Sequence, residues 1–298
     1  MLSILIPTYN YETTTLVKEL NKQAILEDIE FEIIVGDDKS TDLEIIKNNQ
    51  EINSIQRCSY YVNIENLGRA CNRNELVKKA KFEWILFLDC DVLPKDSNFI
   101  HNYIHCLKSN KERIYFGGLI YDLKKPKHDE MLRWIYGHKR ESVILEKRKL
   151  KPYETTLTSN IFIKKEVLIT YPFHAEIKNY GFEDLVFILE LRKNKIAINH
   201  IDNSVYHLNL EKSIIFIEKF ESSLRNLKHL TDSKIIKPKD ARFSKLYNKL
   251  NKFKLTIFLS SSFKFLKPYY LKNLTSQNPS IYIFNLYRLS YFCEIKSK

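Results

Sequence analysis

The most informative segment of this chain of 298 residues is Trp84-Ile85-Leu86-Phe87-Leu88-Asp89-Cys90-Asp91. Five consecutive apolar residues predict a strand that is buried on both faces of a sheet. The run ends abruptly in an Asp-Cys-Asp unit. Because alternate residues of an extended chain project to the same side, Asp89 and Asp91 can present two carboxylates to one divalent cation. The alternative is that the pair caps a following helix, since acidic caps are common.

Similar apolar runs precede this strand and alternate with helical segments. We predict strands at Leu2–Pro7 and Phe31–Gly36 and a helix at Arg69–Lys79. This alternation is typical of βαβ units and a mostly parallel sheet, in which ligands gather beyond the carboxyl ends of the strands. Three polar clusters follow strands at that point: Thr8-Tyr9-Asn10, Asp37-Asp38 and Asp89-Cys90-Asp91.

The pattern changes further along the chain. We predict strands at Ile114–Leu119 and Leu157–Lys164 and a helix opened by Tyr180–Asp184, whereas Lys124–Lys151 gives no clear pattern. From Ser213 onward the apolar spacing predicts helices. We therefore divide the chain into an α/β domain over residues 1–210 and a basic, mainly helical region over residues 211–298.

The formal charge of +12 arises entirely in the C-terminal part. Residues 1–208 carry 30 Lys or Arg and 30 Asp or Glu, whereas residues 209–298 carry 18 and 6. Such a basic, aromatic-rich region suits anionic lipid headgroups, an anionic acceptor or nucleic acid, and the alternative is a solvated lysine-rich face. The apolar segment Leu255–Leu266 is too short to span a bilayer, so it is either a core helix or an interfacial amphipathic helix.

The five cysteines and the N-terminal residues indicate the compartment. The cysteines are odd in number and contain no CxxC pair, which favours a reducing cytoplasm over a disulfide framework or a zinc site. The opening run lacks a basic leader and is interrupted by Pro7, so it is interpreted as a strand and not as a signal peptide. We expect a cytoplasmic protein, with peripheral contact at the inner face of the membrane as an open alternative.

Four segments in this order and spacing carry a family resemblance: Ser3–Asn10, Ile34–Asp42, Asn66–Asn74 and Leu86–Asp91. Together they resemble the family-2 glycosyltransferases of the GT-A fold over roughly residues 1–207. The resemblance implies an α/β, GT-A type fold, with a mostly parallel sheet, flanking helices and a Rossmann-like nucleotide-binding half, plus a C-terminal helical extension. It also implies inverting transfer of a sugar from a nucleotide-diphosphate sugar, with UDP expected, to a hydroxyl on a glycan or lipid-linked oligosaccharide. Surface polysaccharide or glycoconjugate biosynthesis is the expected setting.

The resemblance assigns six residues to the nucleotide-sugar donor: Pro7, Tyr9, Asp38, Arg69, Arg73 and Asp89. Pro7 and Tyr9 would line the base pocket, and Asp38 would recognise the base or the ribose. A tyrosine ring can cover a base face, and a guanidinium fork suits the phosphate oxygens. For Arg73 the alternative is a structural ion pair with Asp38 or Asp89.

The same resemblance implies a metal site and a catalytic base. Asp91 and His207 would hold Mn²⁺ or Mg²⁺, with His200 as the rival histidine. Asp184 would take the proton from the acceptor hydroxyl, and Glu183 would orient the acceptor or the donor sugar. The alternative for this last pair is simple stabilisation of a helix N-terminus by carboxylates.

Three other functions compete with this interpretation. A sugar-phosphate nucleotidyltransferase would be expected to have a glycine-rich loop after the first strand, where Pro7-Thr8-Tyr9-Asn10 contains no glycine. A catalytically silent relative would bind glycan or nucleotide without turnover. A protein binding anionic polymers would use residues 211–298, although we expect no nucleic-acid partner.

Overall fold

The computed structural model describes residues 1–109 and 112–297 and divides into two compact units. The first unit consists of Met1–Asp122, Glu141–Lys178 and Glu183–Asn209. The second consists of Leu123–Arg140, Asn179–Phe182 and Leu210–Lys298. The second unit thus includes two short segments from before residue 210, and the predicted domain boundary stays a prediction.

A seven-stranded sheet forms the centre of the first unit, in the order β3-β2-β1-β4-β8-β6-β9. The strands β1 to β4 run parallel, and β8 is antiparallel to both β4 and β6. This mixed but mostly parallel sheet confirms the predicted fold class. The strands are β1 (Leu2–Thr8), β2 (Phe31–Asp37), β3 (Cys58–Val62), β4 (Trp84–Leu88), β6 (Ile114–Phe116), β8 (Asn160–Lys164) and β9 (Asn199–His200).

A second, three-stranded sheet combines β5 (Val92–Pro94), β10 (Val205–His207) and β7 (Leu119–Ile120). The prediction of one strand over Ile114–Leu119 is wrong, because the chain leaves the large sheet after β6 and enters the small one as β7. The break falls at two glycines. Gly118 has a φ of +105°, and a Cβ at Gly117 would collide with the carbonyl oxygen of Asn203.

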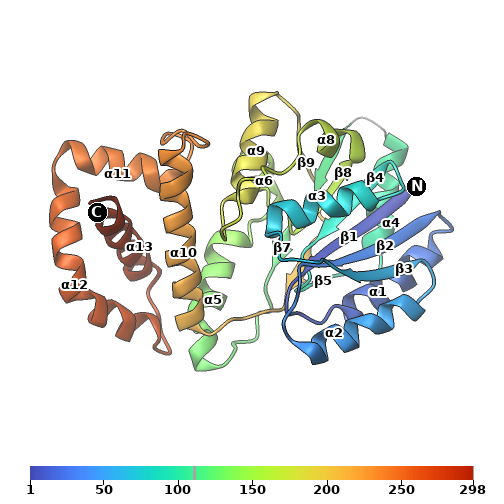
Figure 1. Ribbon diagram of the computed structural model, residues 1–298, viewed down its shortest axis with the longest axis horizontal. Coiled ribbons are helices and arrows are strands. Elements are labelled where there is room, and N and C mark those ends of the chain that lie inside the picture. The colour runs from blue at the N-terminus through green and yellow to red at the C-terminus, as the bar shows by residue number, and fades with distance from the viewer. Residues whose placement is uncertain (110–111, 298) are drawn as a thin grey trace. The chain divides into compact units, whose positions relative to one another are not determined.

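Helices cover both faces of the large sheet (Figure 1). On one face lie α3 (Arg69–Lys79), α8 (Lys165–Thr170) and α9 (Glu183–Lys193), and on the other lie α1 (Thr14–Leu26) and α4 (Phe99–Ser109). The remaining helical segments of this unit are α2 (Leu43–Gln50), η1 (Glu51–Ser54), α6 (Leu145–Leu150) and α7 (Pro152–Thr155).

The central strand β4 is buried at every residue, as its uninterrupted apolar sequence predicts. Ile85 and Phe87 belong to the core cluster formed with α3, α8 and α9. Trp84 instead contacts Phe162 of β8, with ring centroids 4.6 Å apart, and Phe162 lies 4.9 Å from Tyr103 of α4. The alternation of side chains along β4 therefore supplies a core to both helical layers.

The helix bounds agree closely with the sequence for α3 and less closely for α9. The predicted helix at Arg69–Lys79 is confirmed. The helix predicted to open at Tyr180–Asp184 begins only at Glu183. Gly181 and Phe182 have φ values of +92° and +71°, in the left-handed region that an α-helix excludes.

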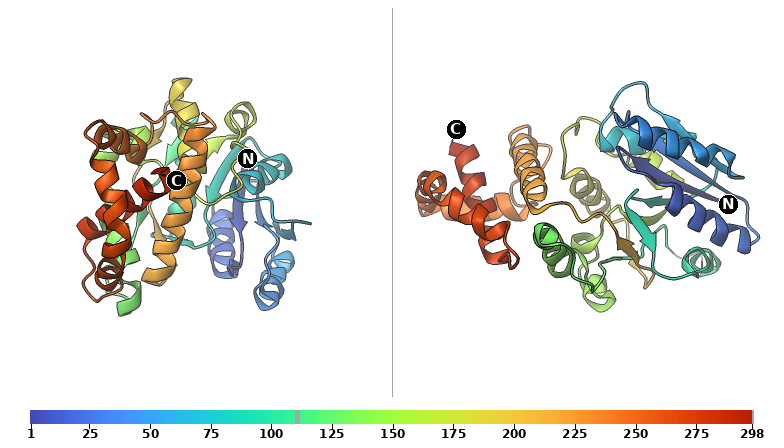
Figure 2. Two further views of the ribbon diagram at one scale, coloured as in Figure 1. Left: turned by 60° about the vertical axis from the view of Figure 1, so that its left-hand side comes forward. Right: turned by 90° about the horizontal axis from the view of Figure 1, so that it is seen from below.

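The second unit is helical. It contains η2 (His128–Glu130), α5 (Met131–Tyr136), α10 (Ser213–Asp232), α11 (Arg242–Lys252), α12 (Leu255–Leu274) and α13 (Ile281–Ser297), and the π-helical turn η3 (Gly137–Glu141) follows α5 (Figure 2). The rings of Tyr136, Phe216, Phe220 and Phe284 contact one another in this unit, and the Arg288 guanidinium lies 4.1 Å from the Phe220 ring centroid. In the described part of the chain, every helix falls short of the length and apolarity that a membrane span requires.

Candidate active site

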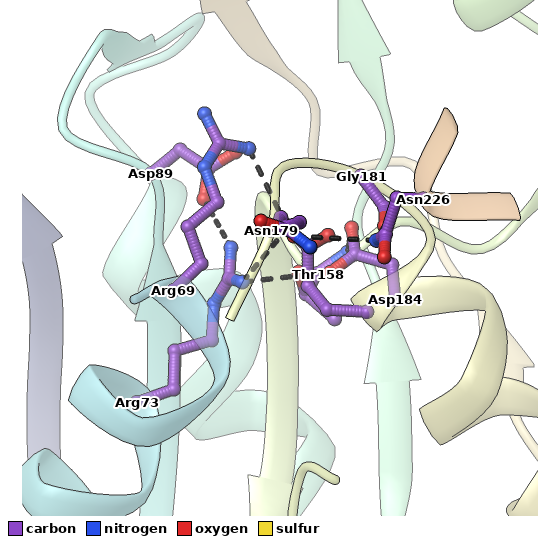
Figure 3. A network of polar contacts seen from close by, with 9 residues as sticks. Arg69, Arg73, Asp89, Thr158, Asn179, Gly181, Asp184 and Asn226 are labelled. Atoms are coloured by element: carbon purple, nitrogen blue, oxygen red, sulfur yellow. Dashed lines mark hydrogen bonds and ion pairs between the residues drawn. The ribbon is translucent and has the colours of Figure 1, made fainter. Parts of the chain in front are cut away.

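The buried guanidinium of Arg73, on α3, joins three carboxylates (Figure 3). Its Nη2 donates to Oδ1 of Asp89 at 2.9 Å, just beyond β4. Its Nη1 lies 3.6 Å from Glu183 and 3.5 Å from Asp184, the first two residues of α9. The Arg73 side chain is only 3% exposed. The ion pair with Asp89 that the sequence left open is therefore present.

Electrostatics keep this guanidinium charged. Burial lowers the pKa of Arg73, but Asp184, Asp89 and Glu183 outweigh that effect and raise the pKa above its ordinary value. Burial also raises the pKa of Asp89, and Arg73 offsets only part of the increase. The carboxylates thus compete for one buried cation, and a second cation at this edge would be electrostatically favoured.

The two acidic residues at the start of α9 differ in accessibility. The Glu183 side chain is 5% exposed and lies 3.5 Å from Arg69 as well as near Arg73. The Asp184 side chain is 31% exposed, and the hydroxyl of Thr158 donates to its Oδ1 at 2.6 Å. Asp184 is therefore held in one orientation and still open to a reactant, whereas Glu183 is enclosed by arginines.

Asp38 is buried at the carboxyl end of β2, where its own chain surrounds it. The backbone N–H groups of Leu67 and Gly68 donate to its carboxylate at 2.8 and 2.9 Å, and the Asn63 amide donates at 3.2 Å. Gly68, with a φ of +81°, directly precedes α3. Asp38 therefore fixes the loop that leads into Arg69 and Arg73. Its contact with a base or ribose stays a prediction.

Pro7 and Tyr9 lie at the same edge of the sheet. Pro7 pairs with Gly36 at the ends of β1 and β2, and Tyr9 is 48% exposed in the turn that follows. Asn10 stabilises this turn, because its side-chain oxygen accepts from the backbone N–H groups of Thr41 and Asp42. An exposed ring on a fixed turn is available to a flat ligand.

The structure brings His207, and not His200, beside Asp91. Strands β5 and β10 are antiparallel with His207 opposite Val92, which leaves its Nε2 3.6 Å from Oδ2 of Asp91. The Tyr121 ring stacks on the imidazole, with centroids 5.2 Å apart.

His200 lies in the interior of the first unit. It is 2% exposed and contacts Arg148, Thr156 and the carbonyl oxygen of Pro152. Burial, with a smaller contribution from Arg148, lowers its pKa to about 4, so the ring stays neutral.

A carboxylate oxygen and an imidazole nitrogen form a donor set that suits Mn²⁺ and tolerates Mg²⁺. Within residues 1–109 and 112–297 no group of three or more His, Cys, Asp or Glu side chains is arranged around a metal position. Asp91 and His207 can therefore supply two ligands, and a cation there would take its other ligands from substrate oxygens and water. Cys90, whose pKa burial raises, is a poor ligand for such a hard cation.

Three residues that support the site had no predicted role: Thr158, Asn63 and Asn10, of which only Asn10 had been named, as part of a polar cluster. Thr158 falls inside the strand predicted at Leu157–Lys164, but β8 begins only at Asn160. Because β8 runs antiparallel to β4, the residues that precede β8 lie at the carboxyl end of β4. The backbone N–H of Asp89 donates to the carbonyl oxygen of Ser159 there. Asn10 offered a signal, since asparagine tolerates the left-handed φ of +48° observed there.

Comparisons with known proteins identify a family and similar folds. A model of the family described as "Glycosyl transferase family 2" matches residues 3–171. The "Uncharacterized glycosyltransferase MG060" of Mycoplasma genitalium is 26% identical over 229 residues, which cover 75% of this chain and 71% of that protein.

Two solved structures share the fold. S. aureus TarS 1-349 in complex with UDP-GlcNAc superposes with a TM-score of 0.53 at 17% identity, covering 99% of this chain and 91% of the other. The mannosyltransferase PcManGT from Pyrobaculum calidifontis, in complex with GDP-Man and Mn²⁺, gives a TM-score of 0.58 at 13% identity, covering 100% and 87%. At such identities the likeness extends to the fold alone.

Proposed function

Since the chain belongs to glycosyl transferase family 2, we propose that it moves a sugar from a UDP-sugar to a hydroxyl of a glycan or lipid-linked oligosaccharide, with inversion at the anomeric carbon. The family resemblance and the GT-A type fold predicted from the sequence are both confirmed. The observation that carries the proposal is the arrangement of Asp89 and Asp184 around one buried guanidinium, with Asp184 still accessible.

The donor would bind along the carboxyl edge of β1, β2 and β4. The exposed ring of Tyr9 suits one face of the base, and Arg69, whose side chain is 54% exposed, suits the diphosphate. We favour UDP because S. aureus TarS, which shares the fold, was solved with UDP-GlcNAc, although PcManGT was solved with GDP-Man.

Asp91 and His207 would hold a divalent cation, Mn²⁺ or Mg²⁺. When bound, such an ion neutralises charge on the diphosphate oxygens. PcManGT, which has a similar fold, was solved with Mn²⁺. In this chain Oδ2 of Asp91 and Nε2 of His207 lie 3.6 Å apart, and both are atoms that can bind such a cation.

Asp184 would act as the general base. Its carboxylate accepts the proton of the acceptor hydroxyl while that oxygen forms a bond to the anomeric carbon. The bond from that carbon to the diphosphate breaks, and the nucleoside diphosphate leaves with the electron pair. Thr158 holds the carboxylate in place at 2.6 Å, and Arg73 balances its charge before the proton arrives.

The proposed function is tested by a panel of nucleotide sugars, with and without Mn²⁺. We expect UDP-sugars to raise the melting temperature of the protein and to be turned over when a suitable acceptor is present. A protein that neither is stabilised by any nucleotide sugar nor turns one over would contradict the proposal.

Asp91→Asn and His207→Ala test the metal site. Each variant is expected to weaken Mn²⁺-dependent UDP binding by about tenfold or more, because one of two protein ligands is lost. His200→Ala is not a suitable control, since it disrupts the interior. His105→Ala, on α4, removes an imidazole elsewhere in the first unit and should leave Mn²⁺-dependent binding unchanged. Titration calorimetry with UDP at several Mn²⁺ concentrations measures the effect, and equal binding by all variants would exclude the assignment.

Thr158→Val tests the positioning of Asp184. Loss of the hydroxyl should lower kcat by about tenfold with little change in the donor KM, because one hydrogen bond to a charged group is removed. Thr158→Ser keeps the hydroxyl and should restore most of kcat. Equal kcat values for the Val variant and the native enzyme would remove Thr158 from this role.

A further inference from the structure

The outer face of α12, in the second unit, carries large apolar side chains that the protein interior does not use. Phe258, Phe265 and Tyr269 are 69%, 79% and 73% exposed. At about 100° per residue, these three positions fall within about 40° of one another on the helix. They form one stripe, about 16 Å long at a rise of 1.5 Å per residue. We call these three residues the aromatic stripe.

The opposite face of α12 fills the core of the second unit. Thr256, Phe263, Tyr270 and Leu274 are buried there. Phe263 contacts Tyr287 of α13, with ring centroids 5.3 Å apart, and Tyr270 contacts the same ring at 6.1 Å. The core contacts of α12 therefore do not involve the aromatic stripe.

The helix that carries the stripe and the helix before it are rich in positive charge. Residues 241–293 include nine Lys or Arg and no Asp or Glu. Lys254 and Lys272 are exposed at the two ends of α12, and Lys264 is exposed along its side. On α11, the exposed residues Arg242, Lys245, Lys249 and Lys252 share one face, within about 80° of one another. Lys254 has a φ of +57° in the short connection between the two helices.

We propose that the aromatic stripe of α12, with the basic residues of α11 and α12, is a docking surface for an anionic phospholipid bilayer. The occupant follows from the chemistry of the surface: aromatic rings enter the boundary between headgroups and acyl chains, and lysines at their sides attract anionic headgroups. A folded acidic protein partner would satisfy the charge but not the long, narrow aromatic stripe. The proposal answers the question that the sequence left open, since α12 is a core helix on one face and an interfacial helix on the other.

This inference concerns the second unit and does not depend on the donor chemistry proposed for the first. Its consequence for that chemistry is simple: a protein held at a bilayer meets a lipid-linked acceptor at a higher local concentration.

Vesicle flotation with the full chain tests the proposal. The native protein should float with vesicles of phosphatidylglycerol and phosphatidylcholine, should float much less with phosphatidylcholine alone, and should be released by salt. The triple variant Phe258→Ser, Phe265→Ser, Tyr269→Ser should bind the anionic vesicles at least tenfold more weakly. The matched control Leu26→Ser, Leu43→Ser, Leu150→Ser removes three exposed apolar side chains from the first unit and should bind as the native protein does.

Two measurements keep the outcome decisive. Circular dichroism and melting of each variant show that it is folded, and transfer to a water-soluble acceptor by the triple variant separates membrane docking from catalysis. Equal flotation of the native protein and the triple variant would overturn the proposal. So would a native dimer that the triple variant converts to monomers in sedimentation experiments, because the stripe would then belong to a second copy. Binding of a nucleic-acid duplex by both proteins, without flotation, would also overturn it.

Discussion

An Asp184→Asn variant is expected to lose sugar transfer by a factor of about 10² to 10⁴, the usual contribution of a general base. The amide has nearly the same shape as the carboxylate, and its oxygen can still accept the hydrogen bond from Thr158. The variant therefore keeps the local structure and loses the group that accepts a proton. Binding of UDP in the presence of Mn²⁺ should change less than about threefold, because Asp184 acts on the acceptor.

The measurement is kcat under saturating donor, with calorimetry for UDP. Asp96→Asn is the matched control, since it makes the same chemical change at a carboxylate that is 63% exposed and outside the site. A kcat for Asp184→Asn within about tenfold of the native value would assign the base to another residue. A large and equal loss of UDP binding would instead indicate that Asp184 belongs to the donor site.

Arg73→Met is expected to destabilise the first unit by about 3 kcal/mol, since removing one partner of a buried ion pair leaves charge without compensation. This value is at the low end of the range for removing one partner of a buried ion pair, because the Asp89 and Asp184 side chains are each 31% exposed. The methionine preserves most of the apolar stem that packs near Phe173, whose ring centroid is 5.4 Å from the guanidinium carbon.

The destabilisation caused by Arg73→Met should depend on pH. Arg73 holds the pKa of Asp89 below the value that burial alone would give, so its stabilising effect is present where that carboxyl is ionised. As the pH falls through the pKa of Asp89 the carboxyl takes up a proton and no longer needs the guanidinium. The difference in unfolding free energy between the native and Arg73→Met proteins should therefore become smaller toward acid pH.

Urea unfolding followed by Trp84 fluorescence reports on the first unit, because Trp84 lies in β4 and is 6% exposed. The second tryptophan, Trp134, lies in the second unit, and a Trp134→Phe background removes its signal. Arg69→Met is the control, as its side chain is 54% exposed and its ion pair with Glu183 should contribute less than about 1 kcal/mol. Equal unfolding free energies for the two variants would show that the burial of Arg73 does not increase its contribution to stability.

Several elements, and the edge of the sheet to which we assign the chemistry, could be predicted from local sequence patterns. The run of five apolar residues predicted β4, and the helix predicted at Arg69–Lys79 is α3. Residues that follow parallel strands must meet at one edge, so Asp38, Asp89 and Asp91 could be placed together without coordinates. The predictions of β4 and α3 succeed because the burial of a single element is reflected in its own local pattern of apolar residues.

Contacts between side chains from distant segments could be learned from the tertiary structure alone. Arg73 and Asp184 are more than a hundred residues apart along the chain and meet through the packing of α3 and α9 on one face of the sheet. The antiparallel course of β8 brings Thr158 to Asp184, and the pairing of β10 with β5 places His207, and not His200, beside Asp91. The same limit applies to α12, whose composition suited both a core and an interface. Contacts between distant segments depend on direction, register and packing, and none of these is encoded in the periodicity of one segment.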